Sequence, residues 1–186
     1  MRLEHGIAAA TLVAAVACAH PSSQSASREA VVAAPGESHL AGVQQLTHGG
    51  ANAEAYFSSS GKQLIFQSTR DGRSCDQQFI MNIDGSGVHR VSTGKGKTTC
   101  GYFFAYDKKI FFASTHAADT ACPPRPDPSK GYVWGLDPFD IYTADADGSH
   151  LERLTKYGVY TAEGTLSPDG RTIVFTSLKD GDLDIY

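Results

Sequence analysis

The chain has 186 residues, of which 41% are hydrophobic and 19% charged. These values are typical of folded globular proteins and exclude a chain that is disordered throughout. The formal net charge is −4, and the chain contains no run of lysine or arginine that would neutralise a phosphate backbone, so we expect no nucleic-acid partner.

The N-terminus has the pattern of a bacterial export signal. Arg2 gives a positive start, and residues 6–17 form an apolar, alanine-rich run. The run is shorter than the roughly 20 residues that a membrane-spanning helix needs. Two processing sites compete: Ala17-Cys18-Ala19 fits the small-x-small pattern of signal peptidase, whereas residues 15–18 resemble a lipobox, in which Cys18 becomes lipidated.

We favour the lipobox. Residues 1–18 are then the signal, and residues 19–42, which turn polar and small with proline and glycine, are a flexible linker. The mature protein is therefore expected to be periplasmic or an outer-membrane lipoprotein. Its contact with a membrane would be made only through the lipid on Cys18.

The rest of the chain repeats a unit of about 45 residues, the length of a four-stranded propeller blade. The segment AEAYFSSSGKQLIFQST from Ala53 returns as AEGTLSPDGRTIVFTSL from Ala162. A weaker copy, TCGYFFAYDKKIFFAST, starts at Thr99 and is lengthened by an insertion at residues 117–138. The repeat aligns three phenylalanines, which we expect in the core between blades: Phe66, Phe112 and Phe175.

Each copy also predicts short antiparallel strands on local grounds. Residues 110–113 and 173–176 are β-branched or aromatic runs, too short for helices. Ser-Pro-Asp-Gly at 167–170 suits a type I turn, and Asp-Gly at 84–85 and 147–148 suits tight hairpins. No helical periodicity follows the signal, so the predicted fold class is all-β.

The motif SPDG at 167–170, continued by Ile173, Phe175 and DIY at 184–186, resembles the repeat signature of TolB-like β-propellers. The resemblance extends over residues 43–186. It implies four-stranded antiparallel blades in an incomplete ring, with these bounds: blade one 53–93, blade two 99–155 and a partial blade three 162–186.

Residues 43–47 match the last strand of a unit, although no other strands of that unit precede them. In closed propellers such a strand commonly completes the final blade and removes an exposed sheet edge. Propeller rings have roughly four to eight blades. We therefore expect this sequence to be truncated, with further repeats in the parent protein.

Blade topology sorts the loops onto two faces. The turns between first and second strands and between third and fourth strands share one face and act as scaffold. The opposite face collects the loops 69–77, 93–101 and 115–138, and a binding site is expected there, at the ring mouth. The candidate binding residues on this loop-rich face are His48, Arg70, Asp71, His116 and Trp134.

Three cysteines follow the signal, namely Cys75, Cys100 and Cys122, and an oxidising compartment favours one disulfide among them. We prefer Cys75 with Cys100, because the loops of adjacent blades lie side by side, although the sequence leaves the other pairs open. A zinc-like set with His116 is the alternative, but no close Cys-x-x-Cys pair is present. We therefore expect no metal. We also expect no cofactor, since GKGKTT at 94–99 lacks the first glycine of a phosphate-binding P-loop.

TolB-like proteins act in envelope complexes, so the resemblance implies a non-catalytic module that binds an envelope protein, peptide or glycan on its loop-rich face. The alternative is the propeller part of an enzyme, either a prolyl-oligopeptidase-type serine peptidase or a propeller polysaccharide lyase. The peptidase would need a hydrolase domain after Tyr186. The lyase would need a cluster of metal-binding histidines at the ring mouth.

Overall fold

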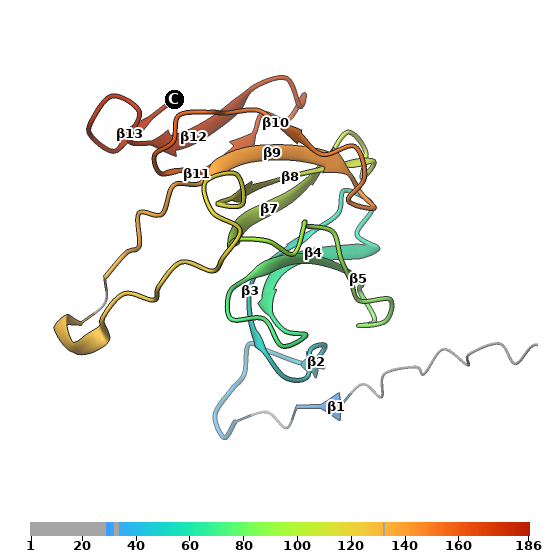
Figure 1. Cartoon of the computed structure of the whole chain (residues 1–186). Coiled ribbons are helices and arrows are strands. Elements are labelled where there is room, and N and C mark those ends of the chain that lie inside the picture. The colour runs from blue at the N-terminus through green and yellow to red at the C-terminus, as the bar shows by residue number, and fades with distance from the viewer. Residues whose placement is uncertain (1–28, 32–33, 132) are drawn as a thin grey trace, which may run out of the picture.

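The computed structural model describes residues 29–31, 34–131 and 133–186 (Figure 1). The expected signal and its Cys18 lie outside the described residues. Within those ranges no helix is both long and apolar enough to cross a membrane. The described residues form thirteen β-strands and one short 3-10 helix, η1 (Pro128–Lys130), so the predicted all-β class is confirmed.

The strands form three successive antiparallel sheets. Blade one contains β3 (Ala51–Phe57), β4 (Gln63–Thr69), β5 (Gln77–Asn82) and β6 (His89–Arg90). Blade two contains β7 (Thr98–Phe104), β8 (Lys109–Ser114), β9 (Asp140–Asp145) and β10 (Glu152–Arg153). Blade three contains β11 (Thr161–Leu166), β12 (Ile173–Ser177) and β13 (Asp184–Ile185). A separate pair joins β1 (Glu29–Ala30) to β2 (Gln44–Gln45).

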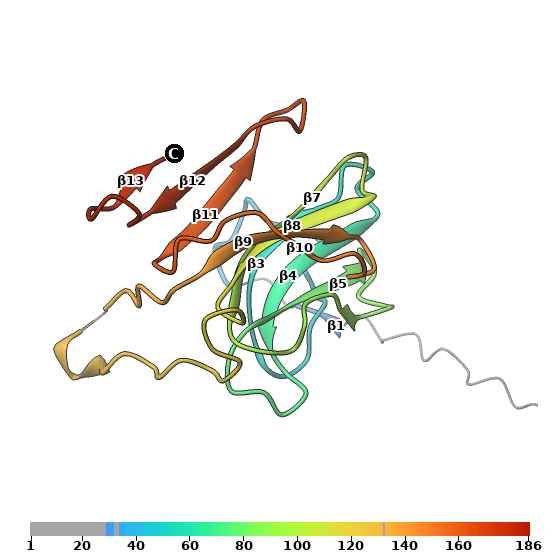
Figure 2. The same cartoon turned by 45° about the horizontal axis from the view of Figure 1, so that its top comes forward.

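The blades stack side by side around their first strands, as the two views show (Figures 1 and 2). Strand β7 packs against β3, β4 and β5, and β11 packs against β7, β8 and β9. Alternation along the second strand of each blade gives two apolar faces. We call the face that carries Phe66, Phe112 and Phe175 the leading face, and the opposite one the trailing face.

The core consists of apolar side chains that are buried where the faces of neighbouring blades meet. The trailing face of blade one, with Ile65 and Ile80, packs on the leading face of blade two, with Ile110, Phe112 and Tyr142. The predicted burial of the aligned phenylalanines is confirmed for Phe66 and Phe112, which are 1% and 0% exposed. Phe175 is half-buried.

The first turn of blade two joins it to blade one. Ala105, Tyr106 and Asp107 all have left-handed backbone, with φ of 50°, 56° and 67°. Non-glycine residues seldom adopt this conformation. It places the Asp107 carboxylate where it accepts hydrogen bonds from the backbone N–H groups of Ser59 and Ser60, at 2.5 and 2.9 Å.

Replacement of Asp107 by asparagine is expected to reduce the acid sensitivity of the fold. Burial opposes ionisation of Asp107, but the hydrogen bonds from Ser60 and Ser59 outweigh it and lower its pKa. A carboxyl whose pKa is lowered on folding stabilises the protein above its unfolded value, about 3.9, and this contribution disappears as pH falls through the folded value. Thermal unfolding between about pH 3 and 7 measures the difference.

At neutral pH we expect Asp107→Asn to cost about 0.5–1 kcal/mol, since the turn is largely exposed. Below about pH 4 its stability should converge with that of the wild type. Asp182→Asn, which removes an exposed carboxylate at the far end of blade three, is the control. A constant offset between Asp107→Asn and wild type at every pH would contradict the proposed role of the carboxylate.

Candidate functional site

The innermost strand of every blade contains a β-bulge at the same position of the repeat. The pairing register shifts between Ala53 and Tyr56, and again at the equivalent points of β7 and β11. The bulged residues are left-handed: Glu54 has φ 48°, Cys100 φ 53° and Glu163 φ 55°. Because a bulge redirects side chains and bends the strand, its repetition brings equivalent side chains from separate blades toward one place.

That place is a cavity of about 340 Å³ on the loop-rich face, which we call the mouth cavity. Glu54 and Glu163 both line it, although they belong to blades one and three. Its other lining residues are Gln67, Asp76, Lys97, Thr99, Pro126, Val133, Trp134, Gly135, Phe139 and Tyr160.

The insertion at 117–138, here called the arm, forms one wall of the mouth cavity and extends away from the blades, with η1 at its tip (Figure 1). The indole Nε1–H of Trp134 donates to the Tyr160 hydroxyl over 3.3 Å, and that hydroxyl donates to Glu163 over 2.9 Å. The arm is thus connected to the bulge of blade three by two successive hydrogen bonds.

The thiol of Cys100 donates to the second carboxylate oxygen of Glu163 over 3.4 Å. Burial raises the pKa of this thiol to about 12, with a smaller contribution from the nearby carboxylates of Glu54 and Glu163. Burial also raises the pKa of Tyr160. Both groups are therefore protonated donors near neutral pH, and Cys100 lacks the thiolate character of a reactive cysteine.

The disulfide joins Cys75 to Cys122, and Cys100 is free and buried, so the preferred pairing of Cys75 with Cys100 is wrong. Cys100 is not in a loop: β7 begins at Thr98, and the thiol lies beside Glu163 of blade three. The start of the arm instead folds back, and Gly96 N–H donates to Thr120 O over 2.8 Å, which brings Cys122 to the loop that carries Cys75.

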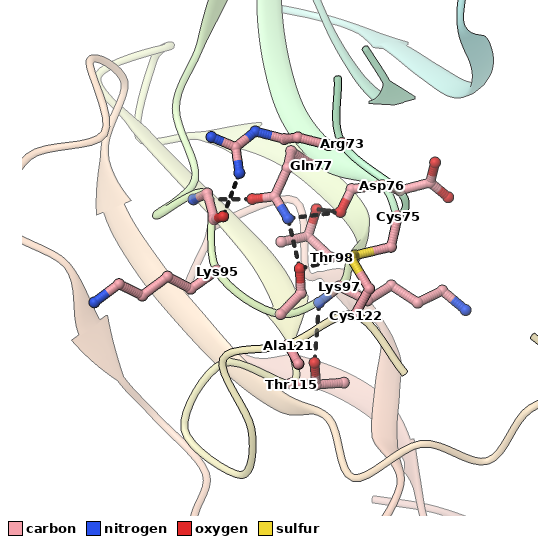
Figure 3. Close-up of a disulfide and its surroundings, with 12 residues drawn as sticks. Arg73, Cys75, Asp76, Gln77, Lys95, Lys97, Thr98, Thr115, Ala121 and Cys122 are labelled. Atoms are coloured by element: carbon pink, nitrogen blue, oxygen red, sulfur yellow. Dashed lines mark hydrogen bonds between the residues drawn. A yellow bond between two sulfur atoms is a disulfide. The ribbon is translucent and has the colours of Figure 1, made fainter. Parts of the chain in front are cut away.

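The polar groups around the disulfide hold three loops together (Figure 3). The amide of Gln77 donates to Gly96 O over 2.7 Å and accepts from Gly94 N–H over 2.9 Å. Lys97 N–H donates to the Thr115 hydroxyl over 3.0 Å. These bonds join residues of both blades to the base of the arm.

Negative groups outnumber positive ones around the mouth cavity. Its lining contains the carboxyls of Glu54, Asp76 and Glu163 against the single ammonium of Lys97, which also lies 3.6 Å from Asp137. Burial raises the pKa of Asp76, and the positive charges of Lys97 and Arg125 oppose this. The lining therefore favours a cationic ligand.

The structure distributes the five sequence-predicted binding residues over three places. Trp134 is 53% exposed and lines the mouth cavity. His48, Arg70 and Asp71 line a separate hollow of about 520 Å³. The guanidinium of Arg70 lies 5.1 and 5.3 Å from the ring centres of Phe66 and Phe79, so it also covers the leading face of blade one.

His116 packs against Tyr142, with ring centres 4.4 Å apart, and its Nδ1 lies 2.8 Å from the Ser114 hydroxyl. Ser114 is 0% exposed, so the hydroxyl that contacts His116 is buried. Among the residues that the structure describes, no three or more His, Cys, Asp or Glu side chains are grouped to hold a metal ion.

Glu54 and Glu163 were not among the sequence-predicted residues, although a signal for them exists. The first and third copies share an Ala-Glu pair at the start of the unit, and Glu54 and Glu163 are the only charged residues of their strands. A carboxylate that recurs in the innermost strand would be costly to bury in the apolar core between blades. Its repetition therefore indicates that the side chain faces the ring axis.

Comparison with known proteins identifies the fold. TolB from Acinetobacter baumannii is similar at a TM-score of 0.55 and 24% identity, covering 77% of this chain and 32% of that one. Putative TolB from Agrobacterium tumefaciens matches at 0.47 and 24% identity, covering 63% and 39%. Oligogalacturonate lyase from Vibrio parahaemolyticus matches at 0.43 and 13% identity, covering 74% and 35%.

The first of these similarities confirms the TolB-like β-propeller fold that the sequence predicted. This chain spans about a third of the length of that TolB structure. No protein-family model matches the sequence, and no curated protein matches it.

Proposed function

We propose that this propeller is a non-catalytic binding module of the bacterial cell envelope, which recognises a basic segment of a protein or peptide in the mouth cavity. One observation carries the proposal: equivalent bulges in blades one and three direct Glu54 and Glu163 to a single cavity. Two inward carboxylates on a repeated, strained backbone are typical of a site and not of a core.

The composition of the cavity favours a cationic side chain. Ligand sites are generally concave and largely apolar, with a few polar groups that fix orientation. Trp134, Tyr160 and Phe139 supply aromatic surface, and a lysine or arginine over such rings gains a cation–π interaction in addition to its ion pair. Peptides carry such groups, whereas neutral glycans do not, so a peptide suits the cavity better than a glycan.

Rigidity of the site supports binding without large rearrangement. The disulfide fixes the base of the arm, and the bonds from Trp134 through Tyr160 to Glu163 fix its wall. A preformed wall lowers the entropy cost of binding. The disulfide is also the kind of bond that persists in oxidising compartments such as the periplasm, which supports an exported protein.

Binding is expected to be detectable by the fluorescence of Trp134, the only tryptophan of the chain. Titration with hexapeptides that contain lysine and arginine should change its emission, and acidic hexapeptides should not. Glu54→Gln is expected to lower the affinity for the basic peptide at least about tenfold, the effect of losing one charged hydrogen bond. Glu163→Gln should do the same, although it also alters the bond from Tyr160.

Glu152→Gln is the matched control, because Glu152 is exposed on the outermost strand β10 of blade two. Its affinity for the basic peptide should equal that of the wild type. Equal affinity for acidic and basic peptides would contradict the proposal. So would binding of a neutral oligosaccharide that is insensitive to Glu54→Gln, which would assign the cavity to glycans.

A further inference from the structure

Blades one and two differ at one charged position of the repeat. In blade two, Arg153 of β10 donates from Nε to Thr155 O over 3.0 Å and from Nη2 to the Asp140 carboxylate over 2.5 Å. Asp140 is 1% exposed, so the acceptor of this ion pair is buried. Blade three has Asp184 at the same position of the repeat. The positive charge on the fourth strand of blade two is therefore neutralised within its own blade.

Arg90 of β6 is the counterpart of Arg153, since each pairs across the strands with the aromatic residue at the same position of the repeat. Its Nε makes the equivalent bond, to Ser92 O over 3.1 Å. The position of Asp140 is taken by Gln77, whose side chain is an uncharged amide. Blade one thus keeps the arginine of the repeat and lacks the carboxylate that neutralises it.

A second guanidinium group lies beside that of Arg90. A methyl group added at Gly94 would lie 3.0 Å from the guanidinium carbon of Arg90 and 3.1 Å from that of Arg73. Arg73 belongs to the loop between β4 and β5, and its Nη1 donates to Gly94 O (Figure 3). Its Nε is buried without a hydrogen-bond partner in the described part of the chain. No described carboxylate forms an ion pair with either arginine.

The glycines of the loop beside this pair do not offer their N–H groups to an anion. Gly94 N–H donates to the Gln77 side chain over 2.9 Å. Gly96 N–H donates to Thr120 O over 2.8 Å. In a P-loop, by contrast, the backbone N–H groups surround the phosphates. An anion at this loop would therefore be held by the two arginine side chains.

Space for a ligand adjoins the pair. Arg73 lines the hollow of about 520 Å³, together with Arg70 and His48. Arg70 donates only to neutral side-chain oxygens, so its charge is not cancelled by them. Asp71 is the only carboxyl group among the residues that line this hollow. The lining is therefore positive, opposite in sign to that of the mouth cavity.

The chemistry of two adjacent guanidinium groups favours a particular anion. Each group is a planar fork that donates two parallel hydrogen bonds to an oxyanion. A carboxylate has one charge and two oxygens, which a single arginine satisfies. A phosphate monoester has a charge of about −1.5 to −2 and three terminal acceptor oxygens. It can therefore bridge both arginines and neutralise both.

We propose that Arg73 and Arg90 bind the phosphate group of a phosphate monoester, either a free compound or the headgroup of a lipid. Because Arg153 is neutralised by a residue of its own blade, the uncompensated charge of Arg90 follows from Gln77 and not from which blades adjoin blade one. Phosphate binding here is independent of the ligand of the mouth cavity.

Isothermal titration calorimetry with inorganic phosphate tests the site. Saturable binding is expected for the wild type, and Arg73→Gln and Arg90→Gln should each lower the affinity at least about tenfold, the effect of losing one charged hydrogen bond. Arg171→Gln is the matched control, because Arg171 is an exposed arginine between β11 and β12, on the opposite face. It removes the same charge, and its affinity should equal that of the wild type.

Gln77→Asp tests the cause of the open charge while both arginines remain in place. The new carboxylate should neutralise Arg90 as Asp140 neutralises Arg153 in blade two, and phosphate affinity should fall at least about tenfold. Circular dichroism of each variant checks that the β structure is retained. A folded Gln77→Asp variant with the phosphate affinity of the wild type would contradict the proposal.

Sedimentation with phosphatidylcholine vesicles, with and without phosphatidic acid, identifies the source of the phosphate. Binding only to vesicles with phosphatidic acid, lost in Arg73→Gln, would support a lipid headgroup. Binding of inorganic phosphate without binding to these vesicles would support a free phosphate compound. The proposal would be overturned if neither probe binds saturably. Equal loss of affinity in Arg171→Gln and Arg73→Gln, or no loss in Arg73→Gln and Arg90→Gln, would also overturn it.

Discussion

Phe112→Ala is expected to lower the free energy of unfolding by about 3–5 kcal/mol, the usual cost of truncating a buried phenylalanine. Phe112 is 0% exposed and packs in the core between blades one and two, in one cluster with Ile65 of blade one and with its cross-strand neighbour Tyr142 of blade two. Truncation of its side chain leaves a cavity between the two sheets. The sheets cannot move together to close it, because each is held by its own backbone hydrogen bonds. Urea denaturation followed by circular dichroism measures the change.

Phe57→Ala is the matched control for this variant. Phe57 ends β3 and is 70% exposed, so we expect its truncation to change the free energy of unfolding by less than about 0.5 kcal/mol. Similar losses for the two variants would mean that Phe112 does not lie between blades, and would contradict the arrangement of the sheets.

The double variant Cys75→Ser with Cys122→Ser is expected to be the second most destabilised. The disulfide closes a loop with a sequence separation of 47, for which the chain-entropy relation gives about 4 kcal/mol. For a chain of this size that is a fall of about 8–16 °C in the midpoint of thermal unfolding. The arm should also lose its position, and binding of a basic peptide at the mouth cavity should weaken.

Unfolding measured with and without reductant distinguishes the contribution of this disulfide to stability from that of the free Cys100. Wild type and Cys100→Ala are expected to lose stability when reduced, because both retain the bond between Cys75 and Cys122. The double serine variant should not respond. A wild type that is insensitive to reductant, or a Cys100→Ala variant that has lost the response, would contradict this pairing.

The blades were predictable from sequence because packing between sheets imposes the repeat. Each second strand must present an apolar residue to both neighbours, so Phe66 and Phe112 recur in register and are buried as predicted. The Asp-Gly pairs at 84–85 and 147–148 mark turns because glycine tolerates left-handed backbone. Gly85 and Gly148 have φ of 81° and 85°. Local turn chemistry and burial agree, and such agreement makes a fold readable from one sequence.

The disulfide was not predictable, because its geometry depends on where a strand begins and how an insertion folds back. The sequence places Cys100 at the end of a loop, whereas β7 starts two residues earlier and carries the thiol inward on a bulge. The return of the arm to Gly96 is a contact between segments that share no repeat pattern. Residues outside the repeat are the ones that sequence periodicity cannot place.

The mouth cavity was predictable in part. Topology assigned Trp134 to the loop-rich face, and the structure has it in the wall of the cavity. His48, Arg70 and Asp71 lie on loops of blade one that open onto a different hollow, because a face formed by several loops need not form a single site. The carboxylates of Glu54 and Glu163 are positioned by backbone bulges, and a bulge leaves little trace in residue types.

Nuclear Overhauser contacts between aromatic rings test the radial stacking of the blades most directly. Tyr56 of blade one and Tyr102 of blade two have ring centres 4.1 Å apart, and Phe139 and Tyr160, from blade two and the start of blade three, are 6.0 Å apart. With selectively labelled tyrosine and phenylalanine, cross-peaks are expected for both pairs. Absence of both from the spectrum of the folded protein would show that the sheets do not stack around a shared axis.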